Sequence, residues 1–84
     1  MTKTINRLEK QVARSEEEIT ALEDRIKARA EELSAPELYQ DFPRWNELHQ
    51  EHEGWKEELD ALTNRWSALS TELADLKDQL ARAG

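Results

Sequence analysis

Apolar residues recur along this chain at alternating steps of three and four, and the pattern runs twice, with an interruption around Pro36 and Pro43. Residues three and four apart share one face of an α-helix, so each run predicts a helix with a narrow apolar stripe. The first stripe comprises Ile5, Leu8, Val12, Ser15, Ile19, Leu22, Ile26, Arg29 and Leu33. The second comprises Trp45, Leu48, His52, Trp55, Leu59, Leu62, Trp66, Leu69, Leu73, Leu76 and Leu80. Together they predict an all-α fold, an antiparallel two-helix coiled-coil hairpin that forms a single domain over residues 1–84.

The helix boundaries follow from capping residues. Thr4 is a candidate N-cap for a first helix over about residues 4–33. Asp41 is a candidate cap for a second helix over about residues 43–83.

The connector, residues 34–42, contains a further helix signal. Ser34 and Glu37 have the spacing of a capping box, with Pro36 in the first turn. We therefore expect a short helical turn in the connector that carries Leu38 and Tyr39.

Folding about this connector sets the expected register. It pairs Leu33 with Trp45, Ile26 with His52, Ile19 with Leu59, Val12 with Trp66, and Ile5 with Leu73, and it brings Trp55 near Leu22. Leu76 and Leu80 then have no partner in the first helix. They indicate a piece of a longer chain, a contact with another molecule, or a frayed end.

Composition narrows the class of protein. The chain has 84 residues, and its apolar and charged fractions are both 37%, which suits a long solvated hairpin with one buried stripe. It contains no cysteine and no apolar run long enough for a membrane span or a signal peptide. We expect a cytoplasmic protein that does not enter the membrane.

The net charge of −7 is unevenly distributed. Residues 1–33 carry seven basic and eight acidic groups, whereas residues 45–84 carry four basic and nine acidic groups. The overall charge argues against nucleic-acid binding, but the first helix is nearly balanced.

The segment LSAPELYQDFPRWNELHQE and the later WKEELDALTNRWSAL carry a family resemblance. The chain resembles the C-terminal coiled-coil domain of the ABC-F group of ATP-binding-cassette ATPases, of the Uup-like type. The likeness rests on the Leu38-Tyr39 pair in the connector and on Arg65-Trp66, with Leu69 one turn farther along. The likeness extends over residues 5–80.

The resemblance implies a parent protein with two ATPase domains upstream of this hairpin and a role in association with the ribosome, in translation, or with nucleic acid. In Uup-like members the hairpin contributes to DNA binding. The chain has only two glycines and lacks the phosphate-binding loop G-x-x-x-x-G-K-[ST], so it cannot hydrolyse ATP by that mechanism. The acidic second helix departs from what DNA binding requires.

Four cations at steps of four, three and four form the candidate nucleic-acid site: Lys3, Arg7, Lys10 and Arg14. They make one outward stripe about 16 Å long. Phosphate backbones are bound by clusters of this kind without base contacts. The alternative is an ordinary solvated face, since Glu9 and the run at residues 16–18 lie nearby.

The three tryptophans are further candidates for binding, because their rings could stack on bases. Trp55 and Trp66 lie on the stripe and are expected in the core, whereas Trp45 should form a small cluster at the hairpin tip with Phe42 and Tyr39, where a binding patch is possible.

His49 and His52 lie one turn apart beside Glu53, but they do not form the zinc motif H-E-x-x-H and no distant third ligand is evident. We expect no metal and no cofactor. A two-helix hairpin offers no enclosed pocket and no nucleophile–base pair, so we expect no enzyme activity.

These observations favour a non-catalytic arm of an ABC-F ATPase that contacts DNA, RNA or the ribosome, as a monomer or weak homodimer. The alternative is a structural or dimerising hairpin that binds protein partners. A third possibility, the coiled-coil arm of a valyl-type tRNA synthetase, fits the Leu-Tyr and Arg-Trp positions less well.

Overall fold

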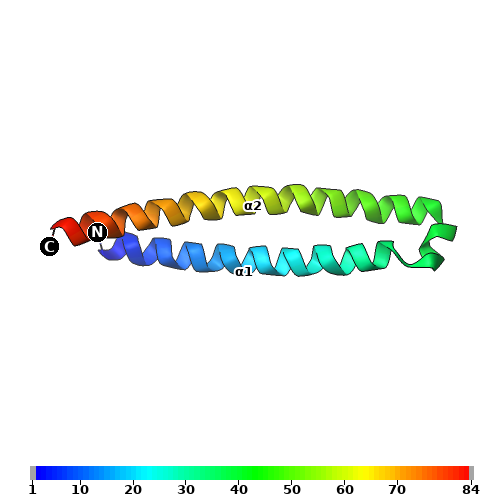
Figure 1. Cartoon of the computed structure of the whole chain (residues 1–84), viewed down its shortest axis with the longest axis horizontal. Helices are drawn as coiled ribbons and strands as arrows, with labels where there is room; N and C mark the ends of the chain where they lie inside the picture. The colour runs from blue at the N-terminus through cyan, green and yellow to red at the C-terminus, as the bar shows by residue number, and fades with distance from the viewer. Residues whose placement is uncertain (1, 84) are drawn as a thin grey trace.

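The computed structural model describes residues 2–83, which form two long antiparallel α-helices and a short 3₁₀ helix between them (Figure 1). Helix α1 spans Thr2–Leu33, the 3₁₀ helix η1 spans Pro36–Gln40, and α2 spans Phe42–Ala83. The molecule is a rod of 65 × 15 × 14 Å. The predicted hairpin is therefore confirmed, including the helical turn in its connector.

The core of the rod is a single layer of side chains between the two helices. Its most buried members come from the predicted stripes and include two polar residues: Ile5, Leu8, Ser15, Leu22, Leu33, Leu48 and His52. No side chain within residues 2–83 is fully enclosed, because two helices cannot surround a side chain on all sides.

Trp55 and Trp66 differ from the expectation that both rings pack in the core. Both are half-buried, since no third helix covers their outer edges. The Trp66 indole N–H donates a hydrogen bond of 3.0 Å to the Glu16 carboxylate, and the Arg25 and Arg29 guanidinium carbons lie 5.4 Å and 4.5 Å from the centre of the Trp55 ring. The rings thus join the apolar seam to the charged flanks.

Direct contacts between the helices fix the register. The Trp45 indole N–H donates to the Leu33 carbonyl oxygen at 3.1 Å, as expected for the predicted Leu33–Trp45 pair. Farther along the rod, Trp66 bonds to Glu16, one turn from its predicted partner Val12. The antiparallel pairing therefore follows the predicted register beside the connector, whereas the Trp66 hydrogen bond farther along is one turn from the predicted partner.

Of the two predicted N-cap residues, one caps its helix and the other does not. The Asp41 carboxylate accepts a hydrogen bond from the Arg44 backbone N–H at 3.3 Å, which makes Asp41 the N-cap of α2 as predicted. Thr4, in contrast, does not cap α1, because that helix already includes Thr2.

The predicted capping box in the connector is wrong. The Ser34 hydroxyl donates to the carbonyl oxygens of Ala30 and Glu31, at 3.3 Å and 2.9 Å, and so satisfies the last turn of α1. The residue before η1 is Ala35, which makes no side-chain cap. Pro36 begins η1 instead, as its fixed φ favours the first position of a helix.

At the connector end, aromatic rings stack along the first turns of α2. Phe42 lies 6.2 Å from Trp45, and Trp45 lies 4.8 Å from His49, with interplanar angles of 18° and 10°. Tyr39 was expected in this cluster, but it joins none of the ring pairs in residues 2–83 and is 61% exposed. The tip cluster therefore consists of Phe42, Trp45 and His49.

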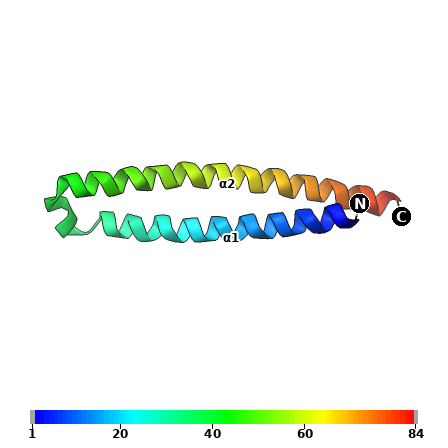
Figure 2. The same cartoon turned by 180° about the vertical axis from the view of Figure 1, so that it is seen from behind.

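At the other end of the rod, α2 continues past the start of α1 (Figure 2). Neither Leu76 nor Leu80 was expected to have a partner in α1. Leu80 is 44% exposed, in line with that expectation, whereas Leu76 is half-buried. Between them, Lys77 forms an ion pair of 3.2 Å with Glu9 of α1. Neither α1 nor α2 contains a stretch that is long and apolar enough to cross a membrane.

Candidate nucleic-acid interface

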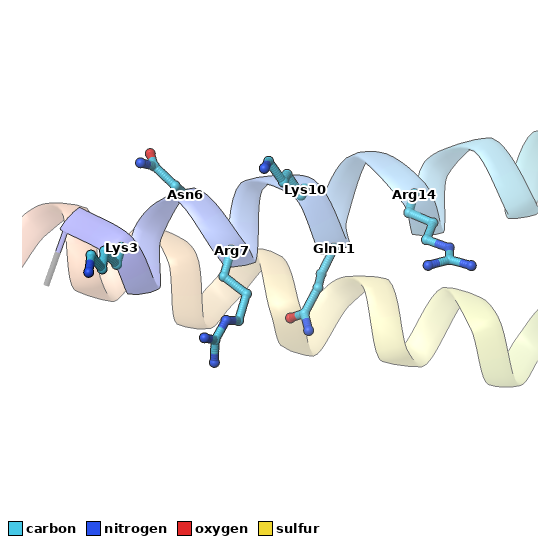
Figure 3. Close-up of a pocket in the computed structure, with 6 residues that line it drawn as sticks. All are labelled: Lys3, Asn6, Arg7, Lys10, Gln11 and Arg14. Carbon is cyan, nitrogen blue, oxygen red and sulfur yellow. The ribbon is translucent and has the colours of Figure 1, made fainter.

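The four predicted cations lie together on the N-terminal half of α1. Lys3, Arg7, Lys10 and Arg14 are all exposed and line one open groove of about 380 Å³ (Figure 3). The helix brings them together because steps of three and four return to the same face. We call this surface the basic stripe.

Two amides that the sequence interpretation missed complete the same groove. Asn6 and Gln11 line it together with the cations, and both can donate hydrogen bonds to phosphate oxygens. Arg7, Gln11 and Arg14 point to the side where α2 runs, whereas Asn6 and Lys10 point away from it (Figure 3). The amides could have been found from their spacing, because positions 3, 6, 7, 10, 11 and 14 follow one helical face.

A further cation comes from α2. Arg65 lines a second groove together with Gln11 and Arg14, so the positive surface continues across the helix pair. Arg65 entered the sequence interpretation only through the family resemblance. Its place beside Arg14 depends on the antiparallel register, which the spacing within one helix does not reveal.

The positive charges of the basic stripe are largely available. Among the ion pairs of residues 2–83, only the contact between Arg14 and Glu18 involves the stripe, at 3.7 Å. The Arg14 side chain remains 83% exposed, and exposed pairs of this kind contribute little. Glu9, the acidic residue closest in sequence, is engaged by Lys77 instead.

Acidic residues limit the basic stripe in one direction. The next groove along α1 is lined by Glu16, Glu17 and Asp24, with small neighbours between them. The sign of the charge therefore reverses near residue 15. A polyanion would be attracted to the first four turns of α1 and repelled by the turns that follow.

This arrangement of cations suits binding to phosphates, which requires no particular base contacts. Several long cations along one exposed helix face can follow a sugar-phosphate backbone, and their binding gains free energy from released counterions.

Comparisons with known proteins show the family of the hairpin and a longer protein to which it is similar. The family model described as ABC transporter C-terminal domain matches residues 2–71. The chain is similar to the "Putative ATP-binding protein YdiF" of Bacillus subtilis (strain 168), with 35% identity over 54 residues. That alignment covers 64% of this chain but only 8% of the relative, so the chain corresponds to a small part of that protein. No solved structure matches the chain.

Proposed function

Because the chain belongs to the ABC transporter C-terminal domain family, as the C-terminal domain of an ABC-F-like ATPase, we propose that it is a non-catalytic arm that contacts nucleic acid. The nucleic acid is DNA, or RNA either free or in the ribosome, and the contact is made in the cytoplasm. ATP hydrolysis belongs to cassettes elsewhere in the parent protein.

One observation carries this proposal: the basic stripe is exposed and mostly free of ion pairs within residues 2–83, although the chain is acidic overall. In a chain of net charge −7, cations gathered on one face can still bind a polyanion if the acidic face turns away. Amides of Asn6 and Gln11 in the same groove supply further donors.

The strength of such binding can be bounded. Four phosphate contacts give a slope of log affinity against log salt of about −3.6 on duplex DNA and about −2.8 on a single strand. Repulsion from the acidic helix should keep the dissociation constant above about 10 μM near physiological salt, at the weak end of the usual non-specific range. The hairpin would therefore assist binding by the parent protein rather than supply it alone.

The test is a fluorescence-anisotropy titration of labelled duplex DNA and single-stranded RNA at several salt concentrations. The test variant replaces Lys3, Arg7, Lys10 and Arg14 with glutamine. The matched control replaces four other exposed cations with glutamine, namely Lys27, Arg44, Lys56 and Arg82, which changes the net charge equally.

We expect the control to bind with the salt slope of the unmodified hairpin, and the test variant to lose binding while its circular dichroism stays unchanged. Equal weakening in both variants would mean that only the total charge matters and would contradict a defined interface. Absence of binding at low salt would also reject the proposal.

The exposed end of α2 supports a second candidate. Leu80 is 44% exposed and can pack against an apolar partner, which fits a structural or dimerising arm. Sedimentation over a range of concentrations distinguishes the two, since this candidate requires self-association or a protein partner and no affinity for nucleic acid.

A further inference from the structure

A second cluster of polar side chains lies at the opposite end of the rod from the basic stripe, near the connector. His49, His52 and Glu53 lie within five consecutive positions of α2, and one donor atom from each lies within 4.8 Å of the others. His52 is 7% exposed, whereas the side chains of His49 and Glu53 are 40% and 51% exposed. The cluster thus runs from the buried seam to the solvent.

His52 has an unmet hydrogen-bonding requirement. Its Nε2 atom is buried and has no hydrogen-bond partner within residues 2–83. Buried polar atoms are nearly always bonded to a protein group, a water molecule or an ion, so an orphan of this kind calls for a partner. An ion held jointly with His49 and Glu53 would give this imidazole one.

The other two side chains are already oriented toward each other. The His49 ring is stacked on Trp45 at 4.8 Å, and its Nε2 atom lies 4.0 Å from the Glu53 carboxylate. Stacking limits the rotation of the imidazole and lowers the entropy lost on binding. The same Glu53 oxygen lies 3.2 Å from the Lys56 ammonium group, which an incoming cation would have to displace.

The donor set selects the class of ion. Two imidazoles and a carboxylate suit zinc, copper and nickel, whereas calcium and magnesium prefer oxygen alone. Three protein ligands also leave a coordination position for water, as in open zinc sites. Ligands of a tetrahedral zinc ion lie about 3.4 Å apart, so side-chain rotations must bring the present donors closer.

We propose that His49, His52 and Glu53 form a binding site for one divalent transition-metal ion of the zinc class. From sequence alone, Glu53 was seen beside the two histidines, and no third ligand from a distant part of the chain was evident. The structure adds that the Glu53 carboxylate and the two imidazoles bring their donor atoms within 4.8 Å of one another. The proposal is independent of nucleic-acid binding, because the basic stripe shares no residue with this site.

Isothermal titration calorimetry of the hairpin with zinc chloride tests the proposal. We expect saturable binding of one zinc ion, weakened about tenfold or more by His49→Gln or Glu53→Gln, because even groups that only orient a metal ligand contribute this much. Glu57→Gln, which removes a carboxylate one turn farther along α2, is the matched control and should bind as the unmodified hairpin does.

Two more variants separate binding from folding. His52→Leu removes a ligand and also the unsatisfied buried nitrogen, so it should lose zinc while unfolding at the same or a higher temperature. Lys56→Gln removes the competing cation and should tighten binding. Absence of saturable binding to the unmodified hairpin would overturn the proposal, as would equal weakening by Glu53→Gln and Glu57→Gln.

Discussion

At the scale of single residues, Arg29 explains how the apolar seam accommodates a charge. Its side chain is 14% exposed and donates a hydrogen bond of 3.0 Å to the Leu48 carbonyl oxygen. The guanidinium carbon lies 4.5 Å from the centre of the Trp55 ring, and Nε lies 3.2 Å from the Glu32 carboxylate. The planar group thus makes hydrogen bonds on two sides while its charge lies over the indole ring, which a smaller ammonium group cannot reproduce.

We therefore expect Arg29→Lys to destabilise the hairpin by about 1–2 kcal/mol, because it keeps the charge but weakens the cation–π contact with Trp55 and loses the fixed hydrogen bond. Urea denaturation followed by circular dichroism measures the change. Arg14→Lys, at an exposed position, serves as the control and should be neutral. A free energy of unfolding unchanged by Arg29→Lys would show that charge alone is needed at this position.

At the scale of the helices, Gly54 is an unexpected residue in the middle of α2. A glycine at this position suggests from sequence a bend or a close backbone contact. The structure shows no close contact there, because a Cβ atom placed on Gly54 meets nothing within 4 Å, and α2 continues through this position without interruption. The position thus bears the entropic cost of glycine without a structural benefit inside the hairpin.

Gly54→Ala should accordingly raise the free energy of unfolding by about 0.5–1 kcal/mol. Ala61→Gly, at an exposed position one heptad farther along, is the mirror-image control and should lower it by a similar amount. Thermal and urea denaturation give both values. Destabilisation of the hairpin by Gly54→Ala would contradict the prediction and show that the backbone at this position requires glycine.

The ends of the helices show which capping residues can be recognised from the sequence. Asp41 could be predicted as an N-cap, because its carboxylate needs only the backbone three residues later. Ser34 was misassigned because a hydroxyl can bond either to the helix before it or to the turn after it, and the two carbonyls of α1 were the better acceptors. Competition between adjacent elements of this kind is not encoded in residue spacing.

At the scale of the whole molecule, the hairpin is far more extended than a globular domain of its size. Its radius of gyration is 18.9 Å, whereas a compact chain of this length would have about 12 Å. Small-angle X-ray scattering should give a value near that of the rod, with light scattering reporting the 9.8 kDa monomer. A mass that doubles with concentration, together with a longer rod, would instead indicate pairing through the Leu80 end.

The repeat of apolar residues was sufficient to predict this rod, because apolar residues at alternating steps of three and four along two helices are typical of a coiled coil. Within the candidate site, Lys3, Arg7, Lys10 and Arg14 could be predicted for the same reason, since they lie on one helix. Arg65 could not be placed beside Arg14 from spacing, because that neighbour depends on how the two helices align. Residue spacing places the four cations on one face, but it does not identify the molecule that they bind.

The contacts that join the helices also imply an order of folding. The Trp45–Leu33 and Arg29–Leu48 hydrogen bonds join residues only 12 and 19 positions apart, whereas Trp66 and Glu16 are separated by 50. Closing the longest of these loops before the shortest would cost about 1.3 kcal/mol more in chain entropy. Folding should therefore begin beside the connector and proceed toward the open end of the hairpin. Substitutions near Trp45 should then slow folding, whereas those near Trp66 should mainly accelerate unfolding.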